Sequence, residues 1–564
     1  MLNNAAHFLF DSEHLNAIEP RLYGFCVTSE GMFTGDCPSF DIQNATGAWV
    51  LVRRTPHGME ISQDSIGCFG LYLYQNGDYW ALSNSFNKLL DYLKTDHKLS
   101  LNEGYAKAFL ADGIGAYTYG ETIIREIRLL DRRVTVLIEP DGSAPKLRMR
   151  SLNEGIIRVD SEAGLLILDA WHDKWASFIA RAARTWPGIL AADLSGGFDT
   201  RMVLAPILSA CIGDRMSYRS NVEHEEDYRI ASGIANEFGF ALNEKPERNK
   251  HRRCPTVESR SERALETIFF EKIIYKSGGK KVVPCLQFCG FGGEAIRNYG
   301  IGKSCSTYSS WLIRRLPKEL QSIKNAAAID SIFKRSYNAI FAMLAQTEGK
   351  NSYRGWPSYY METRARMHFG TRVAADCLSQ NYYQAILFDP LLLKLRAPKE
   401  HPFLITALIL TRYHKALAAF PFDHGRIIPE KSLRLAEQIN ELYPRAAAEK
   451  SAGGDLERPI SWSLLQPQDE GSDDCLAPDE RQSIADLVIA AYDSPRVQKL
   501  FGDQFGEAPA LWTELTAKQI QPNRNRNAIA AIAKVICDIK MGKDAPKDIS
   551  AFIAECLSEA PAAE

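Results

Sequence analysis

Apolar and polar residues alternate with two different periods along the chain, and the period changes near residue 160. From about Tyr23 to Gly142, short apolar runs are separated by Gly, Asn and Asp, as in GAWVLVRR (47–54) and RRVTVLIEPDG (132–142). Such runs are typical of strands joined by turns. The Asn76-Gly77 pair between two of the runs predicts a two-residue hairpin. We therefore predict a β-rich domain over residues 1–150.

The apolar spacing then becomes helical and later alternates with strands. GLLILDAWHDKWASFIARAARTW (164–186) repeats apolar residues three and four positions apart, which predicts a long amphipathic helix. Strand-like and helical runs follow one another from GILAADL (188–194) to KVVPCLQFCG (281–290). This alternation is typical of a parallel sheet with crossover helices. We predict an α/β domain with a doubly wound parallel sheet over residues 160–450.

The rest of the chain is predicted to be helical. Long segments beyond about Ser309 show helical spacing, and the stretch from Glu449 to Asp479 is rich in Gly, Pro, Ser and Asp, as linkers and long loops are. Further helical segments follow, with Ser494 and Pro495 at the start of one of them. The prediction is a helical C-terminal tail over residues 475–564.

Composition excludes several classes of protein. Lys and Arg total 67 against 69 Asp and Glu, and no basic run is interleaved with aromatic residues, so nucleic acid is not an expected partner. The 12 cysteines lack the spacing of a zinc site, which favours reduced thiols. No apolar run reaches the roughly 18 to 20 residues of a membrane helix, and MLNNAAHFLF lacks the features of a secretion signal. We expect a cytoplasmic protein that does not bind membranes.

The segment GILAADLSGGFDTRMVLAPIL (188–208) carries the clearest chemical signal. An apolar strand ending at Leu194 runs into Ser195, Gly196 and Gly197, and an amphipathic helix begins directly afterwards. Glycines let the backbone approach a bulky anion, and a helix start offers unpaired N–H groups, so the pattern predicts a phosphate site. Asp199 and Thr200 would then lie in the first turn, where a carboxylate holds a metal ion. The alternative is a tight turn with a helix cap.

A second strand runs into a glycine-rich turn in LQFCGFGGEAIRNYG (286–300). The turn begins with Cys289 and Gly290 and carries one carboxylate, Glu294. A divalent ion that holds pyrophosphate needs oxygen ligands from more than one loop, so Glu294 is the expected partner of Asp199. The alternative is an ordinary helix start after a turn.

The order of these pieces resembles the asparagine synthetase family, whose motifs read Ser-Gly-Gly-x-Asp-Ser and Gly-x-Gly-Gly-Asp-Glu. They stand here as residues 195–200 and 290–295, and QAILFDPLLLKL (384–395) is similar to the family's Pro-Phe-Leu-Asp segment. Between them, 215–240 is similar to the second strand and helix, with Asp227 at the helix start. The resemblance implies an ATP-pyrophosphatase domain that binds ATP and Mg²⁺. It implies catalytic roles for Asp199, Glu294, Arg426 and Lys431, metal binding by Asp199 and Glu294, and nucleotide binding by Leu194, Ser195, Gly196, Gly197, Thr200, Tyr218, Arg219, Cys289 and Gly290.

The amino-terminal half is similar to the family's glutaminase domain, an amino-terminal-nucleophile (Ntn) hydrolase-like β-sandwich. In that family the chain begins with Cys at position 2, whereas Leu2 stands here. Leucine has no nucleophilic atom, so we expect no glutamine hydrolysis. The nearest cysteine, Cys26, lies in a strand-like run and is expected to be part of the core.

The chain also departs from the family pattern in its second half. Phe291 and Tyr382 replace acidic residues of the two later motifs, so activation of the amine must differ. Arg426 and Lys431 would hold pyrophosphate, with a surface position as the alternative. Glu362, Arg364 and Arg366 alternate along one predicted helix, either lining a pocket for an acidic substrate or, as the favoured alternative, facing solvent.

Three functions agree with these patterns. The first is a ligase that adenylates a small-molecule or peptide carboxylate and joins it to ammonia or another amine. The second is a nucleotide-binding scaffold without turnover, and the third is an asparagine synthetase that uses free ammonia. Association as a homodimer is left open.

Overall fold

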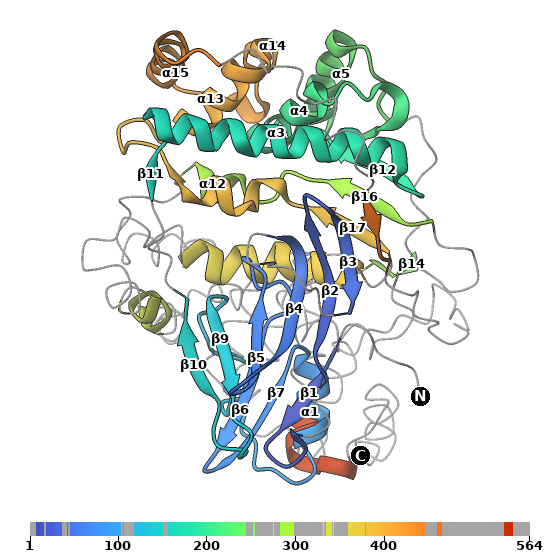
Figure 1. Ribbon diagram of the computed structural model, residues 1–564, viewed down its shortest axis with the longest axis vertical. Coiled ribbons are helices and arrows are strands. Elements are labelled where there is room, and N and C mark those ends of the chain that lie inside the picture. The colour runs from blue at the N-terminus through green and yellow to red at the C-terminus, as the bar shows by residue number, and fades with distance from the viewer. Residues whose placement is uncertain are drawn as a thin grey trace, which may run out of the picture.

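The structure is a computed structural model of the 564-residue chain. Within the residues it describes, the chain is a mixed α/β protein with antiparallel and parallel sheets (Figure 1). The described residues are 7–15, 19–36, 42, 45–102, 105, 118–150, 156–243, 252–253, 274–275, 283–297, 331, 334–340, 342, 359–377, 380–445, 460–464 and 535–544.

Two antiparallel sheets form the amino-terminal half. The larger has the order β10-β9-β5-β4-β2-β3-β19, in which only the last pair is parallel, and the smaller has the order β1-β7-β6-β8. The predicted Asn76-Gly77 hairpin is confirmed, because β6 and β7 pair antiparallel and Gly77 has a φ of +60°. The strands are β1 (Leu9–Asp11), β2 (Arg21–Thr28), β3 (Gly31–Gly35), β4 (Thr46–Thr55), β5 (Gly58–Gln63), β6 (Tyr72–Asn76), β7 (Tyr79–Ser83), β8 (Ile127–Leu129), β9 (Val134–Ile138), β10 (Lys146–Met149) and β19 (Ser461–Trp462).

A four-stranded parallel sheet forms the centre of the second half. Its order is β13-β12-β16-β17, so the strand that precedes each glycine-rich turn lies next to the other. Parallel neighbours end at the same edge, which places the two turns side by side. The strands are β12 (Ile189–Asp193), β13 (Ser217–Arg219), β16 (Cys285–Phe288) and β17 (Asn381–Gln384).

Helices cover both faces of this parallel sheet. The long predicted helix is confirmed as α3, whose Ser161 cap accepts a hydrogen bond from the Gly164 N–H at 3.1 Å. Figure 1 shows α3, α4 and α13 above the sheet, and the yellow helix below it, between the sheet and the antiparallel strands. That helix is a π-helix, η5, continued by α11. The helices are α3 (Glu162–Thr185), α4 (Phe198–Ser209), α5 (Glu225–Phe238), η5 (Met361–Gly370), α11 (Thr371–Cys377), α13 (Leu404–Tyr413), α14 (Lys415–Ala419) and α15 (Glu430–Leu442).

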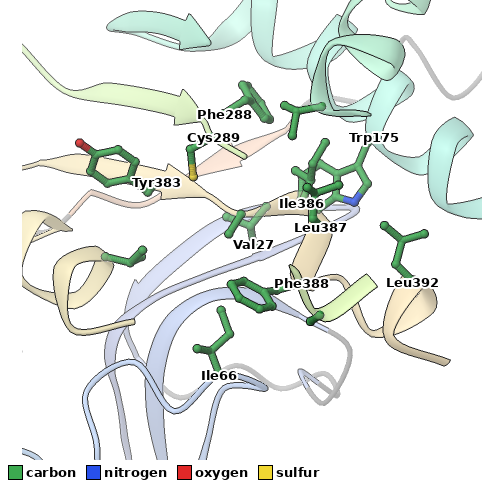
Figure 2. Packing of buried hydrophobic residues seen from close by; sticks show 14 of the residues in the cluster. Val27, Ile66, Trp175, Phe288, Cys289, Tyr383, Ile386, Leu387, Phe388 and Leu392 are labelled. Atoms are coloured by element: carbon green, nitrogen blue, oxygen red, sulfur yellow. The ribbon is translucent and has the colours of Figure 1, made fainter. Parts of the chain in front are cut away.

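One hydrophobic core runs through both halves. Val27 from β2 and Ile66 belong to the same buried cluster as Phe288 from β16 and Trp175 from α3. Figure 2 shows these side chains around the segment that carries Phe388. Burial of apolar surface stabilises by roughly 25 cal/mol per Å², so the continuity of this core fixes the antiparallel strands against the parallel sheet.

A buried network of charged residues also joins the two halves. Glu362 on η5 forms ion pairs with three arginines, at 2.9 Å from Arg132 Nε, 3.6 Å from Arg133 Nε and 3.7 Å from Arg366 NH1. Arg133 in turn holds Asp131 with two side-chain bonds of 2.9 and 2.8 Å. Glu362 and Arg366 are both buried, so the expectation of a solvated helix face is wrong for these two residues. Charges in a low-dielectric interior persist only when they are paired.

The amino terminus and the predicted tail lie largely outside the described residues. Leu2 is among the residues that are not described, and so are most of residues 475–564. The tail is described at 535–544, where Asp538 pairs with Lys94 at 3.2 Å, next to α1 (Phe86–Leu93). Cys26 is fully buried, which confirms its place in the core, and burial raises the pKa of its thiol to about 12. In the described part of the chain, no helix has both the length and the apolarity to cross a membrane.

Asp131 should make the stability of the protein depend on acid pH. Burial alone would raise its pKa, but hydrogen bonds and charge from Arg133 hold the pKa well below 3.8. Because the folded pKa is depressed, this contribution is present above about pH 4 and is lost as the pH falls through the folded pKa. Asp131→Asn should cost about 3 kcal/mol at pH 7 and flatten the stability curve between pH 2 and 5.

Urea unfolding at several pH values measures both effects. The control is Asp78→Asn, which alters an exposed residue and should leave the curve unchanged. An Asp131→Asn protein with the same pH slope as the wild type would contradict the assignment.

Candidate functional site

The first glycine turn joins the end of β12 to the start of α4. Gly197 is the N-cap of this helix, and no side chain within the described structure caps it. The first N–H groups of α4 therefore have no intrahelical partner, and the positive end of the helix dipole faces the turn. These are the elements of an anion-binding helix start.

The three amides of the turn itself are already hydrogen-bonded. Ser195 N–H donates to Thr200 Oγ1, Gly196 N–H to Asp227 Oδ1 and Gly197 N–H to Ser195 Oγ, each at 3.1 Å. A phosphate that used these amides would have to displace those acceptors. An anion could bind other donors without displacing these acceptors. Those donors are the N–H groups at the start of α4 and the hydroxyls of Ser195 and Thr200.

Two residues from elsewhere hold the turn in its sharp bend. The Arg201 guanidinium is buried and donates to Gly196 O at 3.1 Å and to Phe420 O at 2.9 Å. The Asp423 N–H donates to the same Gly196 oxygen at 3.1 Å. A buried guanidinium needs several acceptors, and here backbone carbonyls supply them.

The second glycine turn packs directly against the first. A Cβ placed on Gly293 would lie 1.9 Å from Asp199 Oδ1, and one on Gly290 would lie 3.0 Å from the Thr200 backbone nitrogen. Gly292 has a φ of +104°, a conformation that only glycine adopts readily. The structure thus brings Asp199 and the turn that carries Glu294 together, and the glycines permit this contact.

Asp199 lies at the centre of the electrostatics of this site. Its Oδ2 accepts from Arg297 NH2 at 3.0 Å, whereas Oδ1 is buried and has no hydrogen-bond partner among the described residues. Burial raises its pKa to about 7, with Arg297 lowering it and Glu294 raising it. Burial and the Glu294 charge likewise raise the pKa of Tyr360. An anionic pair with one orphaned oxygen is suited to a cation.

The residues present fit a magnesium ion that is only partly held by protein. The orphaned oxygen of Asp199 and the carboxylate of Glu294 would be its two protein ligands. Among the described residues there is no group of three or more His, Cys, Asp or Glu that would form a complete metal site. Mg²⁺ is commonly bound by one or two carboxylates, with water and substrate phosphates supplying the other ligands.

Three of the remaining residues predicted to bind nucleotide, Tyr218, Cys289 and Leu194, have buried side chains. Tyr218 is buried and stacks on Phe240 with ring centroids 3.8 Å apart, so its side chain faces the core. Cys289 is fully buried, with its Sγ 3.7 Å from Gln384 O. Leu194 is also buried, and its N–H donates to the Arg219 carbonyl at 2.7 Å.

The two predicted basic residues differ in position. Arg426 forms an ion pair with Asp423, lies over the Phe198 ring at 5.4 Å, and has its NH2 3.6 Å from where a Gly197 Cβ would be. Lys431 is exposed in the first turn of α15, and no contact within the described structure joins it to the glycine turns. Arg426 therefore lies at the site, as the sequence predicted.

Aromatic residues stand at the two positions where the asparagine synthetase family, which the sequence resembles, has acidic residues. Phe291 stacks on Phe369 with centroids 4.4 Å apart and on Tyr383 at 6.0 Å. Tyr382 is fully buried, with edge contacts to Phe25 and Trp186. No charge from these two positions faces Glu294.

Four residues of the site were missed by sequence reasoning: Arg201, Arg297, Tyr360 and Asp423. Asp423 also raises the pKa of Asp227, after burial, through its negative charge. Arg201 and Arg297 follow the two motifs by one and two positions, so helical spacing was a usable signal for them. Asp423 and Tyr360 come from distant helical segments, and no local pattern distinguishes them.

A cavity of about 300 Å³ lies at the other end of β12. It is lined by Trp186, Ile189 and Asp214 among others. Ile189 begins this strand, whereas the glycine turn follows its last residue. The cavity is therefore separate from the glycine turns.

Comparison with known proteins leaves the geometry as the main guide. No protein-family model matches the chain, and a search of curated proteins finds no significant match. Function must accordingly be argued from the residues at the two turns.

Gly293→Ala tests the contact between the turns. The new methyl group would overlap Asp199 Oδ1, so we expect a loss of about 1–3 kcal/mol of stability, as for other overpacked positions. Gly233→Ala is the matched control, because this helical glycine meets only Phe420 at 3.6 Å and the change should be neutral or stabilise by about 0.5–1 kcal/mol. Thermal unfolding of the pair measures the difference. Equal stability of the two variants would show that the turns do not pack as described.

Proposed function

We propose that the protein is an ATP-dependent ligase that activates a carboxylate as an acyl-adenylate and transfers the acyl group to ammonia or another amine. The observation that carries this proposal is the meeting of Asp199 and Glu294 where two glycine turns follow adjacent parallel strands. The order of the motifs, which resembles asparagine synthetases, adds the expectation of cleavage between the α and β phosphates.

The proposal also assigns a fold to each half of the chain. A parallel sheet with helices on both faces supports a doubly wound ATP-pyrophosphatase domain, because ligands of such sheets bind at the carboxyl ends of the strands. Two antiparallel sheets in the first half support an Ntn-hydrolase-like sandwich without a nucleophile. A cytoplasmic location agrees with cysteines that are all free among those described.

Charge supports a requirement for a divalent cation. The carboxylates of Asp199, Glu294, Asp227 and Asp423 outnumber the guanidiniums of Arg201, Arg297 and Arg426 around the turns. A triphosphate would be repelled by this surplus of negative charge. Mg²⁺ held by Asp199 and Glu294 would reverse the balance and neutralise charge on the phosphates.

The chain's own donors would hold the leaving group. The start of α4, the hydroxyls of Ser195 and Thr200 and the Arg426 guanidinium surround the first turn, where they would bind the departing pyrophosphate. The carboxylate oxygen of the substrate forms a bond to the α-phosphorus as the bond from that phosphorus to the bridging oxygen breaks. The amine nitrogen then forms a bond to the acyl carbon, the bond from that carbon to the AMP phosphate oxygen breaks, and the proton that the amine loses passes to solvent water.

The second step would use an amine that is already neutral. Phe291 and Tyr382 offer no carboxylate to accept its proton. The amine would be free ammonia or an amine-bearing substrate that enters the site directly. The partners are thus a small-molecule or peptide carboxylate and an amine. Self-association as a homodimer is not required by this chemistry.

A nucleotide-binding scaffold without turnover is the second candidate. Arg297 already occupies one oxygen of Asp199, and the amides of the first turn are bonded within the protein. Both features favour a resting site that must rearrange before catalysis. An asparagine synthetase that uses ammonia is the third candidate, and aspartate in a substrate panel separates it from the other two.

Asp199→Asn should remove most of the affinity for the metal–nucleotide complex. The variant keeps the volume of the side chain but loses the charge that binds the cation, so we expect at least about tenfold weaker binding of α,β-methylene-ATP with Mg²⁺. Isothermal titration calorimetry measures it, with Glu237→Gln, an exposed change on α5, as the control. Unchanged binding in a folded Asp199→Asn protein would rule out this site.

A panel of carboxylic acids scored by ATP–pyrophosphate exchange tests activation without knowledge of the amine. With the right acid, AMP and pyrophosphate should form together, and ¹⁸O from the carboxylate should appear in AMP. Glu294→Gln should reduce the exchange rate more than nucleotide affinity. Formation of ADP and phosphate, or AMP without ¹⁸O, would exclude an adenylate.

A further inference from the structure

Two histidines share one serine hydroxyl where α3, α4 and α13 meet, above the parallel sheet (Figure 1). The hydroxyl of Ser209, the last residue of α4, lies 3.0 Å from His172 Nε2 on α3. It also lies 2.9 Å from Nε2 of His414, which ends α13. The His172 ring is 1% exposed and stacks on Tyr413 with centroids 3.7 Å apart. We call His172, Ser209 and His414 the histidine cluster.

The hydrogen bonds around this cluster fix where its protons lie. His172 Nδ1 lies 3.0 Å from the Asp173 carboxylate, and an ionised carboxylate can only accept, so this nitrogen carries the proton. Nε2 of a neutral His172 is then an acceptor, and the Ser209 hydroxyl donates to it. The Ser209 oxygen in turn accepts from the N–H at His414 Nε2. Two neutral histidines therefore satisfy the serine and both of the nitrogens that face it.

The charged groups around the histidine cluster already balance one another. Two carboxylates on α3 face two guanidiniums, one from α13 and one from the chain after α15. The second guanidinium, that of Arg445, has its NH2 3.4 Å from His172 Nδ1. A proton gained by the histidines would therefore add unbalanced positive charge beside a cation. The pairs are Asp169 with Arg412, at 2.8 and 2.7 Å, and Asp173 with Arg445, together with the exposed Lys415–Glu437 pair at 3.1 Å from α14 and α15, while α5 contributes the Phe238 ring.

Burial keeps both histidines neutral at neutral pH. It is the largest cause that lowers the pKa of His172, where the Arg445 charge acts in the same direction and Asp173 in the opposite one. Burial also lowers the pKa of His414, and the neighbouring His172 adds to the effect. A proton taken up in mild acid turns His172 Nε2 into a donor, so the Ser209 hydroxyl loses the acceptor for its own proton.

The chain that follows His414 runs along α4 to the first glycine turn. His414 is the joint between α13 and α14, so its position sets where α14 begins. Near the start of α4, Arg201 donates to Phe420 O at 2.9 Å. The Asp423 N–H then donates to Gly196 O at 3.1 Å. The same stretch of chain is thus bonded to both ends of α4.

We propose that the histidine cluster is an acid-sensitive latch that holds residues 414–423 against α4. At neutral pH the Ser209 hydroxyl ties His414 to α3 and α4. When the histidines take up a proton from water, the hydroxyl loses its acceptor and the added charge is repelled by Arg445, so this end of the segment loosens. The first glycine turn, bonded to the other end, then becomes more mobile. This latch is independent of the proposed function, because it concerns the shape of the turn and not the ligand that binds there.

Hydrogen exchange at pH 5.5 and 7.5, measured by mass spectrometry and corrected for the intrinsic effect of pH on exchange, tests the latch. In the wild type, protection of the amides at 198–205 and 415–423 should be at least about tenfold lower at pH 5.5. Ser209→Ala removes the shared hydroxyl and should lower protection of these amides at both pH values. Wild-type protection that is equal at the two pH values would overturn the proposal.

His414→Gln removes one titrating group and keeps an N–H that can reach Ser209, so protection in this variant should depend less on pH. His57→Gln is the matched control, because His57 is exposed in the turn between β4 and β5 and should leave the wild-type dependence unchanged. A His414→Gln protein with the full pH dependence of the wild type would contradict the latch.

Urea unfolding between pH 5 and 7.5 provides a second measurement on the same variants. Because the folded pKa of His414 is lowered, its stabilising contribution is present above the unfolded value of about 6.5 and is lost as the pH falls through the folded pKa. The wild type should therefore lose stability as the pH falls below about 6.5, and His414→Gln should flatten this slope while His57→Gln does not. Equal slopes in the wild type and His414→Gln would overturn the proposal.

Discussion

The packing of the Asp199 carboxylate against the backbone of Gly293 is the contact on which the site depends. The Asp199 side chain occupies the space that a Cβ on residue 293 would fill. Gly290, in the same glycine turn, also leaves too little space for a Cβ beside the first turn. Two adjacent parallel strands bring the turns to the same edge, and glycine lets them touch. The oxygen that faces Gly293 is buried and has no hydrogen-bond partner among the described residues, and the proposed cation would supply that partner.

Burial raises a carboxyl pKa to about 7 in both sets of charged residues in this protein, at Glu362 as at Asp199, but the two sets differ in how the charges are paired. Around Glu362, three arginines surround one carboxylate, so the charges are paired and join the halves of the molecule. Around Asp199, carboxylates outnumber arginines, and burial raises the pKa to about 7. Groups with strongly perturbed pKa values and incomplete pairing are concentrated at functional sites. Charge pairing, and not the pKa, is therefore the difference between the two clusters.

Sequence reasoning predicted those features that are set by local pattern. The strand-to-helix order around β12 and β16 followed from periodicity, and the meeting of Asp199 with the Glu294 turn followed from the rule for parallel strands. It failed where distant segments meet. Glu362 and Arg366 looked like a solvated face because their partners, Arg132 for Glu362 and Gly67 and Leu130 for Arg366, are more than 200 residues away along the chain. Tyr218 looked like a ligand contact because its stacking on Phe240 is invisible in the strand pattern. The pairing of β19 with β3 had no signal in two residues of strand.

The most direct measurement is a crystal structure of the chain with α,β-methylene-ATP and Mn²⁺, with the metal located by its anomalous scattering. The account predicts an anomalous peak between Asp199 and Glu294, within coordination distance of both carboxylates, and the β and γ phosphates at the start of α4. A peak away from these two residues, or a nucleotide bound with its phosphates elsewhere, would contradict it.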